Sequence, residues 1–197
     1  MVVFALPRLL IPVESTPGEN RVAATPDTVK KFISLGCSVA VERGAGTSSG
    51  YLDEAYAEQG ADLIGTGDSS AWSQADVVLC VQSPSAATLA LLRQGALVVG
   101  LLSPYANEEL TAALKRSGLS AMALELLPRI SRAQSADALS SQANIAGYKS
   151  VLLASAALDR YFPMLMTAAG TVQPAKVVIL GAGVAGLQAV ATARRLG

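Results

Sequence analysis

The sequence predicts an α/β fold in which helices pack on both faces of a parallel sheet, and two observations lead to this prediction. Short, continuously apolar segments alternate with amphipathic segments of helical length from residue 8 onward. Hydrophobic residues make up 51% of the chain and aromatic residues only 5%, so the core consists mainly of Ala, Val, Leu and Ile. Strands that helices bury on both faces have this continuous apolar character.

The elements follow one another as apolar runs and helical segments bounded by turn residues. Thr25 as N-cap, Pro26 in the first turn and Gly36 beyond the last turn delimit the clearest helix. The helix over 107–118 has acidic residues first and basic residues last, which matches its dipole. The predicted strands are 9–13, 37–42, 61–65, 76–81, 96–102, 119–124 and 176–180, and the predicted helices are 25–36, 53–60, 68–75, 85–95, 107–118, 136–161 and 184–196.

These elements predict three parts. Residues 8–135 form a complete, Rossmann-like parallel α/β domain, 136–168 a connecting helix and linker, and 172–197 the first strand and helix of a second Rossmann domain. A strand and helix without the second strand of their βαβ unit leave an apolar edge and helix face uncovered. We therefore expect the chain to be a fragment of a longer protein, truncated at its C-terminus.

Composition excludes several classes of function. Fifteen basic residues balance fifteen acidic ones, so no net field favours nucleic acid or an anionic membrane. No run reaches the roughly 18 apolar residues of a membrane span. The absence of histidine excludes His-based triads, His zinc sites and His acid–base catalysis in this chain. We expect Cys37 and Cys80, which lie in strand-like runs, to be buried reduced thiols, and we expect no metal site.

The glycine-rich turn after residue 180 is the most specific motif. Gly181, Gly183 and Gly186 form G-x-G-x-x-G, with Val184 and Ala185 between the last two glycines. The motif follows a predicted strand and opens a helix, which is the context in which it binds a dinucleotide pyrophosphate at the helix N-terminus. The alternative is a tight strand–helix turn that binds no ligand.

The segment 128–148 concentrates polar side chains in an otherwise apolar chain. On a helix beginning near Ala136, the residues Asp137, Ser141, Asn144 and Tyr148 form one stripe. A solvated helix face with Ser135 as N-cap would explain the stripe without a ligand. The stripe has few charges, and the following residues are apolar all round, so we expect a helix buried between two domains whose polar stripe serves a polar ligand.

Four segments resemble the N-terminal, NAD(H)-binding part of the alpha subunit of proton-translocating NAD(P) transhydrogenases, in the superfamily shared with alanine dehydrogenase. They are "IPVE…ENRVAATPDTV" (11–29), "VERGAG" (41–46), "PRISRAQSADALSSQANIAGY" (128–148) and "AAGTVQPAKVVILGAGVAGLQA" (168–189). The resemblance implies that Arg129, Gln134 and Asp137 are the catalytic residues, which orient the nicotinamide of NADH. The implied cofactor-binding residues are Arg129, Ile130, Ser131, Arg132, Ala133, Gln134, Asp137, Ser140, Tyr148, Gly181, Gly183, Val184, Ala185 and Gly186.

The same resemblance implies a larger assembly. NADH would pass a hydride directly to NADP⁺ on a partner domain, in reactions coupled to proton translocation. The NADP(H)-binding and membrane domains would come from a beta subunit or from downstream polypeptide, and the domain would be a homodimer. The protein would lie peripherally on the cytoplasmic side of the membrane, or on the matrix side if mitochondrial. The fragment alone would be inactive.

Two alternatives remain. An amino-acid dehydrogenase like alanine dehydrogenase needs a lysine and a histidine near its substrate, and our alignment places Gln82 and Ser103 at these positions, while the arginine that binds the substrate carboxylate is matched by Arg21. With the first two replaced, we expect Arg21 to be structural. A non-catalytic NAD(H)-sensing module would also have the glycine turn, but it does not require a polar segment facing the nicotinamide.

Overall fold

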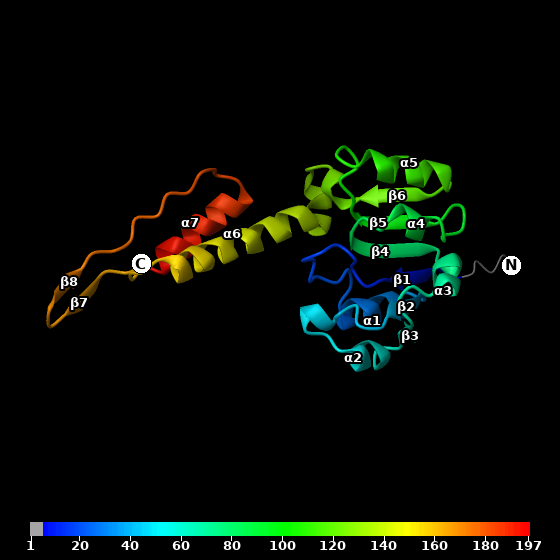
Figure 1. The fold of residues 1–197 in the computed structure, drawn as a ribbon, viewed down its shortest axis with the longest axis horizontal. Helices are drawn as coiled ribbons and strands as arrows, with labels where there is room; N and C mark the ends of the chain where they lie inside the picture. Colours follow the sequence, from blue (N-terminus) through cyan, green and yellow to red (C-terminus); the bar gives the residue numbers. More distant parts are fainter. Residues whose placement is uncertain (1–5) are drawn as a thin grey trace. The chain divides into compact units, whose positions relative to one another are not determined.

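The computed structural model describes residues 6–197, which form one unit up to Leu127 and a second from Pro128 onward (Figure 1). The first unit contains a six-stranded parallel sheet with the order β3-β2-β1-β4-β5-β6. Its strands are β1 (Arg8–Ile11), β2 (Ser38–Glu42), β3 (Asp62–Ile64), β4 (Val77–Gln82), β5 (Leu97–Leu101) and β6 (Ser120–Ala123). This strand order reverses direction between β1 and β4, as in doubly wound dinucleotide-binding folds.

Helices cover both faces of this sheet, and successive residues of each strand point to opposite faces. On one face, Leu9, Ile11 and Val41 pack with the helices α1 (Pro26–Ser34) and α2 (Asp53–Ala57). On the other face, Leu10 and Val78 pack with α3 (Ser69–Gln74), α4 (Ala86–Leu89) and α5 (Glu108–Arg116). The predicted Rossmann-like α/β fold is confirmed.

The helix predicted over 85–95 is shorter in the structure. Ser85 caps α4 by accepting a hydrogen bond from the backbone N–H of Thr88, and the helix ends at Leu89. Leu89, Leu92 and Ala96 belong to one buried cluster, so the chain turns after the helix to bring them to the same core. Burial of these side chains therefore overrides the helical tendency of the segment.

The second unit consists of one long helix, a hairpin and a final helix (Figure 1). The 3₁₀ helix η3 (Ser131–Ala136) leads into α6 (Ala138–Ala157), which begins and ends inside the predicted range 136–161. The strands β7 (Leu165–Thr167) and β8 (Gly170–Val172) form an antiparallel hairpin where the sequence predicted only a linker. The helix α7 (Val184–Arg195) follows the glycine-rich turn as predicted.

Two predictions for the second unit are wrong. Residues 176–180 pair with no strand among the residues that the structure describes, since a strand requires a neighbour to which its backbone bonds. The helix α6 is also not buried all round, because its buried residues are Gly147 and Val151, while Ile145 and Leu153 are each 58% exposed.

Within the described range 6–197, none of the helices has the length and apolarity that crossing a membrane requires. Both thiols are free, with Cys80 buried and Cys37 half-buried. Burial raises the pKa of the Cys80 thiol to about 12, and the nearby Glu14 adds to this effect. Cys80 is therefore an unreactive thiol at neutral pH.

Candidate functional site

The polar segment lies at the start of the second unit, where it forms a tight turn before α6. The backbone N–H of Ile130 donates to the carbonyl of Pro128 over 2.8 Å, and that of Ala133 donates to the carbonyl of Ile130 over 2.9 Å. These bonds and the 3₁₀ helix that follows fix the backbone. The exposed side chains that they present are those of Arg129, Ile130, Ser131, Arg132 and Gln134.

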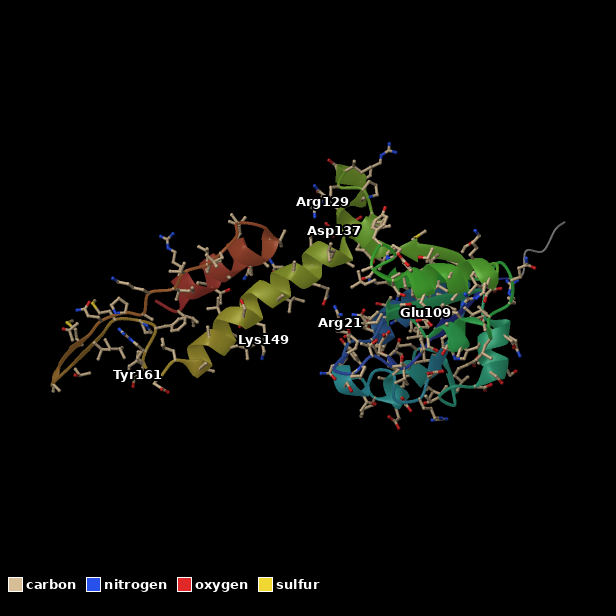
Figure 2. All side chains as sticks on the ribbon, turned by 45° about the horizontal axis from the view of Figure 1, so that its top comes forward. Arg21, Glu109, Arg129, Asp137, Lys149 and Tyr161 are labelled. Atoms are coloured by element: carbon tan, nitrogen blue, oxygen red, sulfur yellow. The ribbon has the colours of Figure 1, made fainter. Side chains whose placement is uncertain are left out.

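Asp137 joins this turn to the helix. Its Oδ1 accepts the backbone N–H of Ser140 over 2.8 Å and its Oδ2 accepts the Ser140 hydroxyl over 2.6 Å, so Asp137 is the N-cap of α6. The predicted cap, Ser135, is therefore wrong, because the helix starts later. The bond from the Ser140 hydroxyl lowers the pKa of Asp137, and the positive charge of Arg129 contributes to this shift. Figure 2 shows Arg129 and Asp137 near the start of α6.

The structure divides the predicted polar stripe. The Ser141 hydroxyl turns back to the carbonyl of Asp137 over 3.1 Å, and the Asn144 amide donates to Gln188 of α7 over 3.3 Å. Tyr148 is 48% exposed. Each oxygen of the ionised Asp137 keeps a second lone pair beside its bond to Ser140, so Asp137 and the turn before it are the part of the stripe suited to a ligand.

The glycine-rich turn has the geometry that a pyrophosphate needs. Gly181 has a φ of +110°, which favours glycine. A β-carbon on Gly186 would lie 2.1 Å from the Gly181 carbonyl oxygen, so this position needs glycine for packing. A β-carbon on Gly183 would meet no atom of the described chain within 4 Å. The third position is therefore required by the protein, whereas the second leaves open space beside the backbone.

The start of α7 is open toward that space. Gly183 is its N-cap and, having no side chain, forms no side-chain capping bond; Val184 and Ala185 begin the helix. The first N–H groups of a helix have no partner within the helix, and they bind anions readily. The residues of this turn therefore fit the pyrophosphate of a dinucleotide.

The second unit thus brings together the two groups of predicted site residues. The helices α6 and α7 pack side by side and run in the same direction (Figure 1), and Val151 and Ala189 share a buried cluster. The polar turn precedes α6 and the glycine turn precedes α7, so both turns lie toward the N-terminal end of this helix pair.

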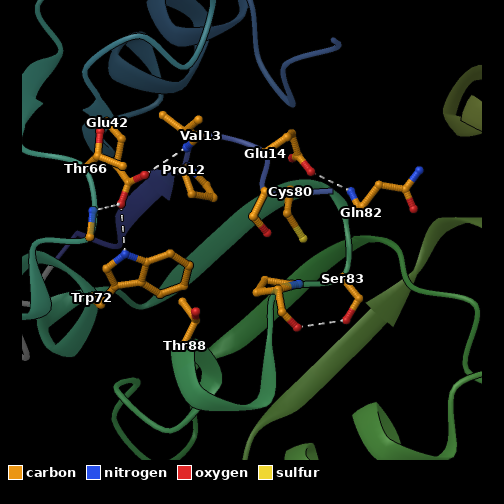
Figure 3. Close-up of a pocket in the computed structure, with 13 residues that line it drawn as sticks. Pro12, Val13, Glu14, Glu42, Thr66, Trp72, Cys80, Gln82, Ser83 and Thr88 are labelled. Atoms are coloured by element: carbon orange, nitrogen blue, oxygen red, sulfur yellow. Dashed lines mark hydrogen bonds between the residues drawn. The ribbon is translucent and has the colours of Figure 1, made fainter. Parts of the chain in front are cut away.

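The first unit contains a cavity of about 170 Å³ at the point where the strand order reverses (Figure 3). Glu14, Glu42, Cys80 and Gln82 contribute to its lining. Ligands of open α/β sheets commonly bind at such a point, beyond the carboxyl ends of the strands. Here the carboxylate of Glu14 accepts the backbone N–H groups of Val81 over 2.5 Å and of Gln82 over 3.0 Å. Backbone donors at this edge therefore already bind a carboxylate of the protein itself.

The residues at the positions of a dehydrogenase substrate site are engaged with one another. Arg21 donates from Nε to Glu19 over 2.7 Å, and Gln82 donates its amide to the same carboxylate over 3.0 Å. The bond from Arg21 lowers the pKa of Glu19 to about 2. Ser103 has a φ of +48°, and its backbone N–H donates to Glu125. Arg21 thus bonds within its own loop.

Three glutamates with clear structural roles were not identified from the sequence. Glu14 and Glu42 each end an apolar run, "LLIPVE" and "SVAVE", and Glu125 follows "SAMAL". A single acidic residue at the end of a buried strand was the available signal, because such a residue reaches the loops that follow neighbouring strands. Burial raises the pKa of Glu14, and this effect outweighs its two bonds from backbone N–H groups.

Comparisons with known proteins match nearly the whole chain. Residues 10–146 match the family model "Alanine dehydrogenase/PNT, N-terminal domain", and residues 150–197 match "Alanine dehydrogenase/PNT, C-terminal domain". An NAD(P) transhydrogenase alpha subunit of Rhodospirillum rubrum, in the first of its separate polypeptides, is 49% identical over 195 residues, which cover 96% of this chain and 50% of the relative.

Solved structures agree with these matches. A transhydrogenase from Sinorhizobium meliloti has a TM-score of 0.92 and 50% identity, covering 96% of this chain and 56% of its own. An L-alanine dehydrogenase has a TM-score of 0.83 and 32% identity, covering 96% of this chain and 52% of its own. The chain spans about half the length of the curated relatives that it matches.

Proposed function

The chain belongs to the alanine dehydrogenase/PNT family, and on this basis we propose that it is the NAD(H)-binding component of an NAD(P) transhydrogenase. In this role it presents NADH so that a hydride passes directly to NADP⁺ on a partner domain. The observation that carries the proposal is the pairing, in one unit, of an anion-binding glycine turn with a polar turn rich in hydrogen-bonding side chains.

The two turns would share the work of binding. The open N–H groups at the start of α7 would hold the pyrophosphate, and Gly183 would let the backbone approach it closely. Arg129, Gln134 and Asp137 would orient the nicotinamide carboxamide and its ribose. The bonds from Ser140 hold the Asp137 carboxylate in place, so its orientation does not have to be fixed when the ligand binds.

The reaction needs positioning more than proton transfer. The bound dihydronicotinamide supplies the hydride, and no proton enters or leaves the two reacting carbons. The chain contains no histidine, and its candidate site offers Arg, Gln, Asp and Ser. Groups that fix the ring against the acceptor account for catalysis by orientation and proximity.

The higher identity to a transhydrogenase subunit than to alanine dehydrogenase supports this function over the dehydrogenase alternative, at 49% against 34%. Gln82 and Ser103 occupy the positions of the catalytic lysine and histidine of that alternative. We further propose that the complete protein is a dimer, peripheral on the cytoplasmic or matrix side of the membrane. Its NADP(H)-binding and membrane domains would lie on a beta subunit or downstream polypeptide, and hydride transfer would be coupled to proton translocation.

Isotope transfer tests the proposal. The full-length protein is mixed with an NADP(H)-binding transhydrogenase domain, C4-deuterated NADH and NADP⁺, and the NADPH formed is analysed by mass spectrometry. We expect deuterium in NADPH without loss to water. NADH-dependent reduction of pyruvate with ammonia, without transfer to NADP⁺, would instead support the amino-acid dehydrogenase.

Variants of the polar turn test its role in the same assay. We expect Arg129→Ala and Asp137→Asn to slow hydride transfer about 10- to 100-fold while changing NADH affinity less, since they misorient the ring. Asn is as good an N-cap as Asp, so Asp137→Asn leaves α6 folded. Unchanged turnover in both variants would refute the orienting role.

A further inference from the structure

Gly147 allows α6 and α7 to pack as closely as they do. It is buried in α6, and a β-carbon at this position would lie 2.1 Å from the carbonyl oxygen of Ala185 and 2.8 Å from its carbonyl carbon. Both are backbone atoms, so no change of side-chain rotamer relieves the overlap. Any other residue at position 147 therefore pushes the first turn of α7 away from α6.

A glycine here works against the helix that contains it. Glycine is among the residues least favourable to a helix interior, and alanine is the most favourable. Substitution by alanine would favour α6 considered alone. The contact with α7 is thus the feature of the structure that requires glycine at position 147.

This contact sets the level of the glycine turn along α6. Ala185 lies in the first turn of α7, directly after the glycine turn. Val151 packs with Ala189 in one buried cluster, and Asn144 bonds to Gln188, so the two helices keep one register. From the cap at position 137 to position 147, α6 rises about 15 Å at 1.5 Å per residue. The polar turn and the glycine turn are therefore held at a fixed separation.

We propose that Gly147 is a positioning residue that sets the separation between the pyrophosphate-binding turn and the nicotinamide-orienting turn. The inference rests on the proposed function and extends it. The glycine turn is held by its own contact between Gly186 and Gly181, and the polar turn by the cap at Asp137. A displaced α7 keeps each turn intact, and only their alignment changes. Ligands that span both turns sense the change, whereas ligands that occupy only the pyrophosphate side do not.

The test compares a whole dinucleotide with a ligand that lacks the nicotinamide. Calorimetry on the full-length protein measures the Kd of NADH and of ADP-ribose for wild type, Gly147→Ala and the control Ala146→Ser, which adds one atom at an exposed neighbouring position. We expect Gly147→Ala to raise the Kd of NADH about tenfold or more, and that of ADP-ribose less than about twofold. We expect Ala146→Ser to change neither.

Other outcomes separate the two proposals. Equal weakening of both ligands in Gly147→Ala, or no weakening of either, would overturn the positioning role and leave the proposed function standing. A wild-type protein that binds neither ligand would overturn the proposed function, and this inference with it.

A second variant covers the case in which Gly147→Ala does not fold. Gln188→Ala removes the bond between Asn144 and Gln188 without adding an atom. We expect the ratio of the NADH Kd to the ADP-ribose Kd to rise about two- to fivefold, because α7 is held less firmly at one level. An unchanged ratio in folded Gln188→Ala would contradict the role of helix spacing.

Discussion

Single glutamates at the carboxyl edge of the sheet hold the loops of the first unit together. Each of Glu14, Glu42 and Glu125 accepts hydrogen bonds from backbone N–H groups of neighbouring segments. The donors are those of Val81 and Gln82 for Glu14, Val13 and Gly67 for Glu42, and Leu102 and Ser103 for Glu125. Bonds to a charged acceptor are stronger than those between neutral groups. The carboxyl edge is therefore stabilised largely by these side chains.

Glu42 offers the clearest test of this arrangement. It is only 3% exposed, and it also accepts the indole N–H of Trp72 over 3.0 Å. In Glu42→Ala three donors lose their acceptor, and we expect the free energy of unfolding to fall by roughly 3 kcal/mol. Urea unfolding followed by Trp72 fluorescence measures the change. The exposed control Glu58→Ala should differ little from wild type, and an equally small effect of Glu42→Ala would refute the prediction.

Glu19 should make stability depend on acid. The bond from Arg21 lowers its pKa from about 4.5 to about 2, so between these values the unfolded chain binds more protons than the folded one. This contribution is present in full above pH 4.5 and is lost as the pH falls toward 2. Arg21 is 39% exposed, so screening by solvent reduces the contribution to about 1 kcal/mol.

The measurement compares urea midpoints of wild type and Glu19→Gln from pH 6 to pH 3. The variant lacks the titrating group, so we expect its stability to fall less steeply over this range. Burial raises the pKa of Glu14, which has the opposite sign, and Glu14 is retained in both proteins. Parallel curves for the two proteins would count against the ion pair as the cause.

At the scale of elements, helices with their own caps were predictable and those without were not. Thr25 caps α1 and Asn107 caps α5 through side-chain oxygens, as the residue types at these positions indicate. The hairpin β7–β8 was missed because its strands are only three residues long and no apolar alternation identifies them. Gly170, with a φ of +128°, was the local signal of a turn. Short elements depend on their partners, which the local sequence does not contain.

The glycine turn and α7 allow packing to be separated from binding. The β-carbon of Gly183→Val meets no described atom within 4 Å, so this variant should fold as well as wild type and bind NADH at least about tenfold more weakly. Gly186→Val overlaps the Gly181 carbonyl and should lower the melting temperature as well. Thermal melts and NADH titrations of the full-length variants measure both effects. Wild-type NADH affinity in Gly183→Val would argue against pyrophosphate binding at this turn.

At the scale of the whole chain, the sequence located the candidate site better than it described the surroundings of that site. The residues singled out in the polar and glycine turns lie in one unit, because both segments have strong local signals. The close contact at Gly147 had no such signal, since a glycine within a helical pattern does not reveal which backbone passes beside it. The strand predicted at 176–180 likewise depends on pairing that lies outside the segment.

That apolar segment yields the last prediction. Val178 is 82% exposed and Leu180 is 96% exposed, whereas Ile179 packs against the buried cluster of the second unit. An unpaired apolar edge readily adds a neighbouring strand. In a polypeptide with the full length of the relatives, we expect 177–180 to become a paired strand. Hydrogen exchange should then slow about 100-fold or more at these amides, compared with a polypeptide of residues 1–197. The amides of β4, which pair in the first unit, serve as the control and should exchange equally in both polypeptides. Equal exchange at 177–180 would mean that this segment stays unpaired in the longer protein, and that the glycine turn follows an irregular segment instead of the first strand of a Rossmann domain.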